Sequence, residues 1–593
     1  MSQATSICGD FVLATGPGAG AWLRGLAGFE HQDDAGGGLS LATRGNVLQG
    51  RDASGTRWLA LADLVEGRPE AIVHHDAGAL RRLRGRFALL GWNDAGGRVV
   101  AATDQFGSLP LYWYRRDGHF ALSNDLRLLL DAPGVRRDVD LAAVYHYLNF
   151  GYIPAPATIC RDIRRIEPGT RMALDADGAS GTRYYRPEYP ADIQGDDDAL
   201  AAALRERITA TVHDYRPDGE DWGCFLSGGT DSSSIVTLLA TQGAGQVQTC
   251  SIGFHEAGYD ELDFARRAGE ACGARPHLAY VDRERALGLL GTVIDAYDQP
   301  FGNTSAIPTL ACAELGRASG FPVMIGGDGG DEIFGGNQRY AKDKVLEAFY
   351  RLPSPLKAGA RAVGDLVGRG NIHFLNRVKN FAYRGSQPNP DRFYTDDSFA
   401  SDYYGELLTP AFREQVERDA SLEFMRTVYG DDPGDEPLHR LMRLDLMMAI
   451  AQNDLVKVHG ACRHHGVSAR FPYLDPDLVD WCGRLPARQK VRGLDKRHLF
   501  KKAMSGVLPD AILRKRKQGF GLPTAVWLRE DRATQDLMRD VLLDGRTRGR
   551  GWIEPAFVDR LLQAHMAGAW DHSGAIWQLL VLELWMRKYM DGH

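Results

Sequence analysis

The chain has 593 residues, of which 44% are hydrophobic and 25% are charged, a composition typical of a globular protein with a sizeable core. The net charge is −7, from 70 basic and 77 acidic residues, and no long basic run occurs, which argues against a nucleic-acid partner. No stretch approaches the roughly 20 apolar residues that a membrane-spanning helix needs, so no membrane insertion is expected. The length predicts several domains or two large ones.

The cysteines and the N-terminus indicate a reducing compartment. Eight cysteines are scattered without a Cys-x-x-Cys pair, and several lie in apolar runs, as reduced buried thiols do. The first residues, MSQATSICGD, lack the basic and apolar regions of a secretion signal. We therefore expect a cytoplasmic protein.

Residues 1–182 are rich in glycine and contain short apolar segments such as RFALLGWN and RVVAATD. Turn signals, among them Asn93-Asp94 and Asp117-Gly118, separate these segments and predict a mostly β domain. Residues 183–199 combine prolines with an acidic run and predict a linker.

From residue 200 to 593 the pattern is different. The segment ALAAALRERITATVHDY has helical periodicity, and it is followed by the strand WGCFL and a helix from about residue 231. A second strand, within QVQTCSIGF, and a second helix, within DELDFARRAGEAC, follow. This alternation predicts an α/β domain with a parallel sheet covered by helices, and the chain beyond about residue 400 reads as largely helical.

One strand-to-helix junction, CFLSGGTDSSSIVTLLA (224–240), has the features of a phosphate loop. Gly228 and Gly229 permit close backbone approach to a ligand at the positive end of the following helix, and the hydroxyl side chains add donors. Asp231 would repel a phosphate unless a cation lies between them, so it implies Mg²⁺. The Walker pattern is not met. The alternative is a Ser/Gly helix cap without a ligand, which needs one serine and not the whole set.

A second glycine-rich acidic segment, MIGGDGGDEIFGGNQRY (324–340), also follows an apolar strand and supplies Asp328, Asp331 and Glu332. Loops at the carboxyl ends of neighbouring parallel strands face one crevice. Asp231 and Asp331 are therefore expected to share one Mg²⁺ on a triphosphate. Taken alone, the segment could equally be a Gly-rich turn.

A third segment, ILRKRKQGFGLPTAVWL (512–528), carries a run of basic residues. Its cations could lie over a polyphosphate or over charge that develops in a transition state. The alternative is a solvated basic turn.

With these segments the chain resembles the asparagine synthetase family, which joins an N-terminal glutaminase domain to an ATP-pyrophosphatase synthetase domain. LSGGTDSS and GGDGGDEIFGG look like the two nucleotide signatures of the family, and ARFPYLDPDLVDW, KRHLFKKAM and LPDAILRKRKQGFGLP follow in the family's order. In the first 182 residues, LRGRFALLGWND and ATDQFGSLPLYWY look like the end of the glutaminase domain. The resemblance implies an Ntn-hydrolase-like α+β sandwich followed by an adenine nucleotide α-hydrolase-like domain.

The resemblance also implies the chemistry and its residues. A substrate carboxylate attacks the α-phosphate of ATP to give an acyl-adenylate and pyrophosphate, and an amine then displaces AMP; ATP and Mg²⁺ are the implied co-substrate and cofactor. Lys517 would stabilise the transition state, and Asp328 is the weaker catalytic candidate. Asp231 and Asp331 would bind the metal. The implied nucleotide-contacting residues are Leu226, Ser227, Gly228, Gly229, Asp231, Ser232, Ser233, Ile252, Gly326 and Gly327.

Two departures from the family pattern bear on function. Glutaminases of the family begin Met-Cys-Gly and use the cysteine as residue one, whereas here the candidate is Cys8 and no Asn-Gly-Glu segment follows. This predicts an inactive first domain, unless removal of seven residues frees Cys8.

In the synthetase half, VKVHGACR places His459 and Gly460 where the family has Asp-Arg, and Gln299 and Asn303 stand where carboxylates are usual. These changes predict an altered acceptor pocket, although a histidine in place of aspartate also fits local repacking.

Because the chain retains the nucleotide signatures and lacks the glutaminase features, it is most similar to the β-lactam synthetase and lasso-peptide cyclase branch of the family. The resulting hypothesis is an AMP-forming amide ligase that closes a macrolactam on a peptide or amino-acid-derived carboxylate, with a leader-peptide protease as a partner by analogy. The alternatives are a glutamine- or ammonia-dependent asparagine synthetase, a β-lactam-synthetase-like ring closure, and a non-catalytic scaffold.

Overall fold

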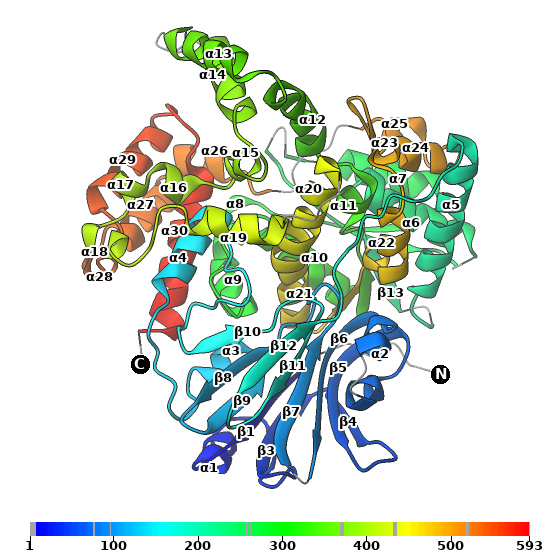
Figure 1. Ribbon diagram of the computed structural model, residues 1–593, viewed down its shortest axis with the longest axis vertical. Helices are drawn as coiled ribbons and strands as arrows, with labels where there is room; N and C mark the ends of the chain where they lie inside the picture. Colours follow the sequence, from blue (N-terminus) through cyan, green and yellow to red (C-terminus); the bar gives the residue numbers. More distant parts are fainter. Residues whose placement is uncertain are drawn as a thin grey trace.

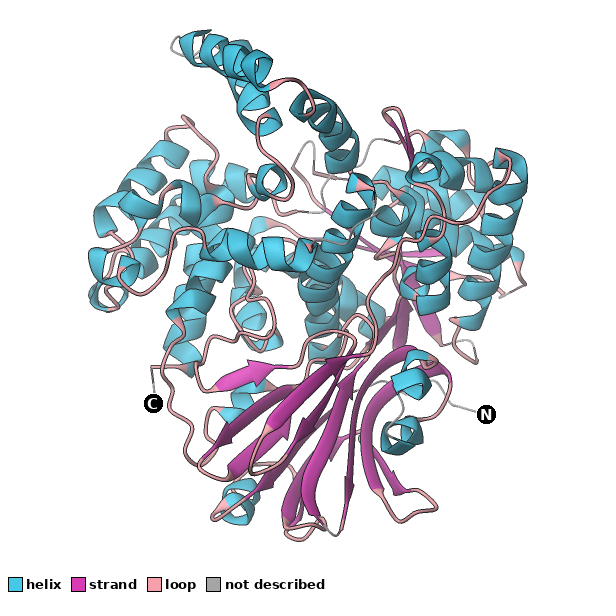
Figure 2. Cartoon of the chain, viewed as in Figure 1, coloured by secondary structure: helices cyan, strands magenta, loops and turns pink. Residues whose placement is uncertain are grey.

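The protein has a β-rich N-terminal half on which a mostly helical half rests, as the computed structural model shows (Figures 1 and 2). No helix among the described residues combines the length and the apolar character that crossing a bilayer requires. The structure describes residues 8–74, 77–94, 96–219, 221–243, 245–256, 259–260, 262–367, 373–430, 436–515 and 521–591.

Two antiparallel six-stranded sheets form the N-terminal half. The order in the first sheet is β10-β8-β9-β1-β3-β2, and in the second β12-β11-β7-β6-β5-β4. The strands of the first sheet are β1 (Gly9–Thr15), β2 (Glu30–Gln32), β3 (Leu39–Gly45), β8 (Tyr112–Arg116), β9 (His119–Ser123) and β10 (Ile163–Arg165). Those of the second are β4 (Leu48–Arg51), β5 (Arg57–Glu66), β6 (Arg84–Asn93), β7 (Gly96–Thr103), β11 (Thr170–Leu174) and β12 (Ala179–Arg183).

Both faces of β1 are buried, which explains its unbroken apolar run. Phe11 and Leu13 belong to one core cluster together with residues of β5, β6 and β7. Val12 and Ala14 belong to a second, larger cluster that continues into the C-terminal half. Because successive side chains of a strand point to opposite faces, one face of this sheet lies in a sandwich and the other packs toward the rest of the chain.

The predicted parallel sheet is present, with the order β15-β14-β13-β16-β17. β13 pairs in parallel with β14 on one side and with β16 on the other, so the carboxyl ends of these strands lie at one edge. The predicted elements around the first loop are confirmed within a few residues. The strands are β13 (Trp222–Phe225), β14 (Gln248–Gly253), β15 (Arg275–Tyr280), β16 (Val323–Ile325) and β17 (Ser468–Arg470).

Helices surround this sheet and make up most of the chain beyond residue 400, as the sequence predicted. Residues 184–196, in the predicted linker, contain no helix or strand, yet Tyr185 and Tyr189 are buried. The principal helices named below are α5 (Asp197–Asp214), α6 (Thr230–Thr241), α7 (Leu262–Ala271), α12 (Gln338–Tyr350), α13 (Ser354–Val367), α14 (His373–Gly385), α21 (Leu455–His464) and α30 (Ser573–Tyr589).

A buried ionic cluster joins the two halves. Arg463, at the end of α21, donates to Asp125 of the N-terminal half at 2.9 Å and to Asp298 at 3.1 Å, and it also contacts Asp10. Burial and the neighbouring Asp125 together raise the pKa of Asp298 to about 6, although Arg463 and Arg127 act in the opposite direction. Arg127 also pairs with Asp125 at 2.7 Å and lies 3.5 Å from Asp298, and Arg44 pairs with Asp10. Arg463 is the cation that all three carboxylates share.

We expect Arg463→Met to destabilise the folded chain by up to about 3 kcal/mol, because three carboxylates lose their shared cation while Arg127 and Arg44 still pair with them. Thermal unfolding followed by circular dichroism measures the effect. The matched control is Arg24→Met, which breaks an exposed ion pair with Asp33 and should cost less than about 1 kcal/mol. Equal unfolding temperatures of the two variants would contradict the assigned role of the cluster.

Candidate active site

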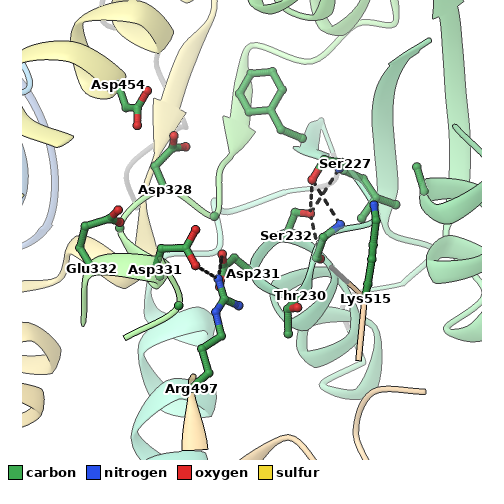
Figure 3. Close-up of a pocket in the computed structure, with 18 of the residues that line it drawn as sticks. Ser227, Thr230, Asp231, Ser232, Asp328, Asp331, Glu332, Asp454, Arg497 and Lys515 are labelled. Atoms are coloured by element: carbon green, nitrogen blue, oxygen red, sulfur yellow. Dashed lines mark hydrogen bonds and ion pairs between the residues drawn. The ribbon is translucent and has the colours of Figure 1, made fainter. Parts of the chain in front are cut away.

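The first predicted loop lies between β13 and α6 and has the local structure of an anion site. Helix α6 begins at Thr230 after an extended Gly229, so the capping position carries no side chain. Ser227 Oγ and Ser232 Oγ lie 3.3 Å apart and face each other across the loop (Figure 3). The backbone N–H groups at the start of a twelve-residue helix and its dipole favour a negatively charged ligand at this point.

The second loop, after β16, lies directly against the first. A Cβ atom on Gly330 would approach Asp231 Oδ1 to 2.5 Å, and a Cβ atom on Gly327 would approach the backbone nitrogen of Ser232 to 2.9 Å. Only glycine permits this approach of the two loops. The requirement explains why the GGDGGDE segment carries glycine at these positions.

Arg497 brings the two predicted metal ligands together. Its guanidinium donates to Asp231 Oδ2 at 2.5 Å and also to Asp331 Oδ1, so one cation lies between the two carboxylates (Figure 3). Burial disfavours the charge on Arg497, but the attraction of Asp231 and Asp331 more than offsets it and raises the pKa. The residue has a left-handed backbone, with φ 55°, which is uncommon outside glycine and is often associated with functional sites.

The two carboxylates fit a divalent cation. The structure shows that their shared position stabilises positive charge, and carboxylate oxygens combined with phosphate oxygens are the usual ligands of Mg²⁺. Asp231 and Asp331 would hold the ion, which would offset the charge of a polyphosphate. Sequence reasoning missed Arg497, although it lies in the quoted segment KRHLFKKAM.

The site opens into a cavity of about 920 Å³. Asp328, Glu332 and Asp454 lie at the side away from Ser227 and Ser232, and Lys515 lies beside the phosphate loop (Figure 3). Asp454 ends a π-helical segment, η3 (Leu446–Asp454), a rare conformation that occurs frequently at functional sites. The cavity therefore combines an anion-binding end with an acidic end.

The predicted site residues divide into three groups. Gly228 and Gly326 lie in the two loops but not on the cavity wall, and Ser233 is buried in α6. Lys517 lies outside the described residues, so its role stays a prediction. The residues that line the cavity as expected are Leu226, Ser227, Gly229, Asp231, Ser232, Ile252, Gly327, Asp328 and Asp331.

His459 and Gly460 line a smaller neighbouring cavity together with Gln299 and do not line the large one, so their effect on the acceptor pocket stays a prediction. Asp454, Lys457 and Val458 face the large cavity, whereas Val456, His459, Gly460 and Arg463 face a second cavity of about 40 Å³. Each set has the i, i+3, i+4 spacing of one helix face. The chain at the start of α21 thus separates the two cavities.

His459 also connects the two halves of the protein. Its Nδ1 lies 3.1 Å from a guanidinium nitrogen of Arg86, and Arg86 also donates to the Ala469 carbonyl at 2.5 Å. Because arginine only donates, Nδ1 must accept, which requires the proton of the neutral ring on Nε2. Burial and the neighbouring arginines hold the pKa of His459 well below its ordinary value, in agreement with a neutral ring.

The geometry of the site defines a class of protein. A phosphate loop and a loop with paired carboxylates lie at one edge of a parallel sheet, and the cavity beside them is large enough for a nucleotide and a second molecule. This arrangement is typical of a nucleotide-dependent transferase or ligase. The profile of the Asparagine synthase family matches residues 203–587, and the profile of the glutamine amidotransferase domain matches residues 70–185.

The chain belongs to the asparagine synthase family, and it is an ATP-dependent carbon–nitrogen ligase that produces AMP and pyrophosphate. A Mycobacterium tuberculosis protein named putative asparagine synthetase (glutamine-hydrolyzing) is 30% identical over 92% of this chain and 83% of its own length. Asparagine synthetase (glutamine-hydrolyzing) 1 of Bacillus subtilis is 26% identical over 86% and 79%. Amidase chry2 of Gibberella zeae is 22% identical over 77% and 72%.

Proposed function

We propose that this ligase adenylates a carboxylate of a peptide or amino-acid-derived substrate and captures it with an amine of the same molecule, without glutamine hydrolysis. The observation that most supports adenylation is that Asp231 and Asp331 converge on one cation, Arg497, beside the α6 phosphate loop. The specific substrate we propose is a lasso-type precursor peptide, which is closed to a macrolactam. A leader-peptide protease is then the expected partner.

The residues of the cavity fit this sequence of events. The α6 N-terminus with Ser227 and Ser232 would hold the phosphates, and Mg²⁺ on Asp231 and Asp331 would neutralise their charge. Lys517 would offset the charge that develops during transfer. At the other end, the carboxylate of Asp328 would attract the substrate amine and orient it toward the acyl group, while Asp454 pairs with Lys457 at 2.6 Å.

The N-terminal half supports the proposal that glutamine is not the nitrogen source. We divide the chain into an inactive Ntn-type domain (1–182), a linker (183–199) and the synthetase domain (200–593). Cys8 directly precedes β1, and no Asn-Gly-Glu segment follows it in the chain.

Carboxylate-dependent exchange of pyrophosphate into ATP tests the adenylation step, and mass spectrometry tests ring closure by the loss of one water. We expect both with short peptides that carry a free N-terminus and one internal Asp or Glu. Cys8→Ala should leave exchange and product unchanged. Product that needs glutamine, and that Cys8→Ala abolishes, would overturn the proposal.

The second candidate is an asparagine synthetase, because the relatives from Mycobacterium and Bacillus carry that name. Exchange that depends on free aspartate, followed by asparagine formation with ammonium or glutamine, would favour it. A peptide substrate and free aspartate are therefore compared in the same exchange assay.

A further inference from the structure

Three helices project from the body of the protein and form what we call the helical arm, residues 338–367 and 373–385 (Figures 1 and 2). The arm consists of α12, α13 and α14; α13 packs along α14, and α14 packs against α12. Its first residue, Gln338, lines the large cavity. The arm therefore begins at the active site and extends away from it.

The charge of the arm is opposite to that of the rest of the chain. Residues 338–367 and 373–385 contain nine lysines and arginines but three aspartates and glutamates, a formal charge of +6, and two of the arginines, Arg339 and Arg384, pair with Asp396 and Asp397 outside the arm. Because the whole chain carries −7, all other residues together carry −13. A basic projection on an acidic protein attracts acidic partners and directs them to one place.

The arm also exposes apolar side chains. Val345, Leu352, Leu356, Phe381 and Tyr383 are 40–59% exposed, and they are five of the nine large exposed hydrophobic residues in the described chain. The arm holds 43 of the 593 residues, so this share is far above chance. Exposed apolar side chains concentrated beside basic ones in one projecting element are typical of a surface for an amphipathic partner.

This surface is continuous with the rim of the cavity. The hairpin of β18 (Val491–Arg492) and β19 (Asp495–Lys496) carries Leu494 at its tip, which is 65% exposed and lines the cavity. Lys344 of α12 donates to the Val491 carbonyl at 2.8 Å, and Lys496 donates to the Gly336 carbonyl at 2.9 Å. The arm, the hairpin and the cavity rim are thus fastened to one another.

We propose that the helical arm binds an acidic, amphipathic segment of the polypeptide that carries the reacting carboxylate. The inference rests on the proposed function and adds to it a polypeptide substrate that is held outside the cavity as well as in it. A membrane surface would match the charge, but it would not explain why the surface continues to the cavity rim. A segment bound on the arm would keep its reacting end close to the active site and raise its effective concentration there.

The test uses the full-length protein and a fluorescent peptide of about 20 residues, with Asp and Glu on one helical face and Leu and Phe on the other. We expect binding by fluorescence anisotropy that weakens with salt, and no binding of the same peptide with Lys in place of the acidic residues. The double variant Lys342→Glu/Leu356→Asp, at two exposed positions of the arm, should bind at least about tenfold more weakly. The control is Leu48→Asp, at an exposed leucine of the N-terminal half.

Enzymatic readouts separate this inference from the proposed function. The double variant should raise KM for a long acidic peptide substrate and leave kcat and ATP affinity unchanged, with an unaltered unfolding temperature. Equal peptide binding by the variant and by Leu48→Asp would overturn the inference, as would binding to phosphatidylglycerol vesicles without peptide binding. If the protein binds no ATP and shows no exchange, the proposed function fails whatever the arm binds.

Discussion

Asp231→Asn is expected to lower the affinity for Mg²⁺–ATP by about tenfold or more, equivalent to at least about 1.4 kcal/mol. The substitution keeps the shape of the side chain but removes one of the two negative charges that would hold the metal. Arg497 would still pair with Asp331, so the loops should remain folded. Isothermal titration calorimetry with ATP, in Mg²⁺ and in EDTA, measures the effect.

The two buffers distinguish metal binding from nucleotide binding. In EDTA, Asp231→Asn should bind ATP at least as well as the parent protein, because it has lost a charge that repels phosphate. Asp477→Asn, at an aspartate whose side chain is 78% exposed, is the control and should behave as the parent. An unchanged affinity for ATP in Mg²⁺, or an equal loss of affinity in both buffers, would contradict the assignment of Asp231 as a metal ligand.

Arg497→Met should destabilise the metal-free protein by about 3–5 kcal/mol, because it removes the guanidinium shared by Asp231 and Asp331 in a buried site. Added Mg²⁺ should restore part of this stability, since a divalent cation at the same position would again separate the two carboxylates. The increase of the unfolding temperature with Mg²⁺ should therefore be larger in Arg497→Met than in the parent protein.

Arg497→Lys is the matched variant, because it keeps a positive charge but not the fork that reaches two carboxylates. It should lie between the parent and Arg497→Met in stability. A destabilised Arg497→Met variant that does not respond to Mg²⁺ would show that the two aspartates do not form a metal site. An Arg497→Met variant as stable as the parent would show that the ion pairs contribute nothing.

Both predictions describe one position with two alternative cations. Arg497 occupies the space between the carboxylates, where Mg²⁺ on a polyphosphate would also be held. Gly336 permits this arrangement, since a Cβ atom there would lie 1.9 Å from Asp331 Oδ1 and 2.0 Å from Arg497 Nε.

The nearness of Asp231 and Asp331, 100 residues apart, was predictable from sequence. Each follows a short apolar strand, and strands that alternate with helices form parallel sheets whose carboxyl ends share an edge. The glycines of both loops are local requirements of close approach and are equally visible in the sequence. The family resemblance, the β-rich first part and the helical end of the chain were also predictable from the sequence, because each depends on patterns within short segments.

The role of Arg497 and the position of His459 were not predictable in this way. Arg497 reaches the carboxylates because β19 packs against α12 and the Arg497 N–H donates to the Gly335 carbonyl, just after α11 (Gly330–Phe334), and no periodicity encodes these contacts. His459 lies two residues from Lys457, but a helix turns about 100° per residue, so the two side chains point into different cavities.

By itself, the sequence determined which segments meet phosphate and metal, because glycine content, strand ends and helix starts are properties of short stretches. The tertiary structure alone decided which cation lies between the aspartates, which face of α21 belongs to which cavity, and where the basic helices project. These features depend on how distant elements pack, and packing energies are sums over many contacts that a linear pattern does not contain.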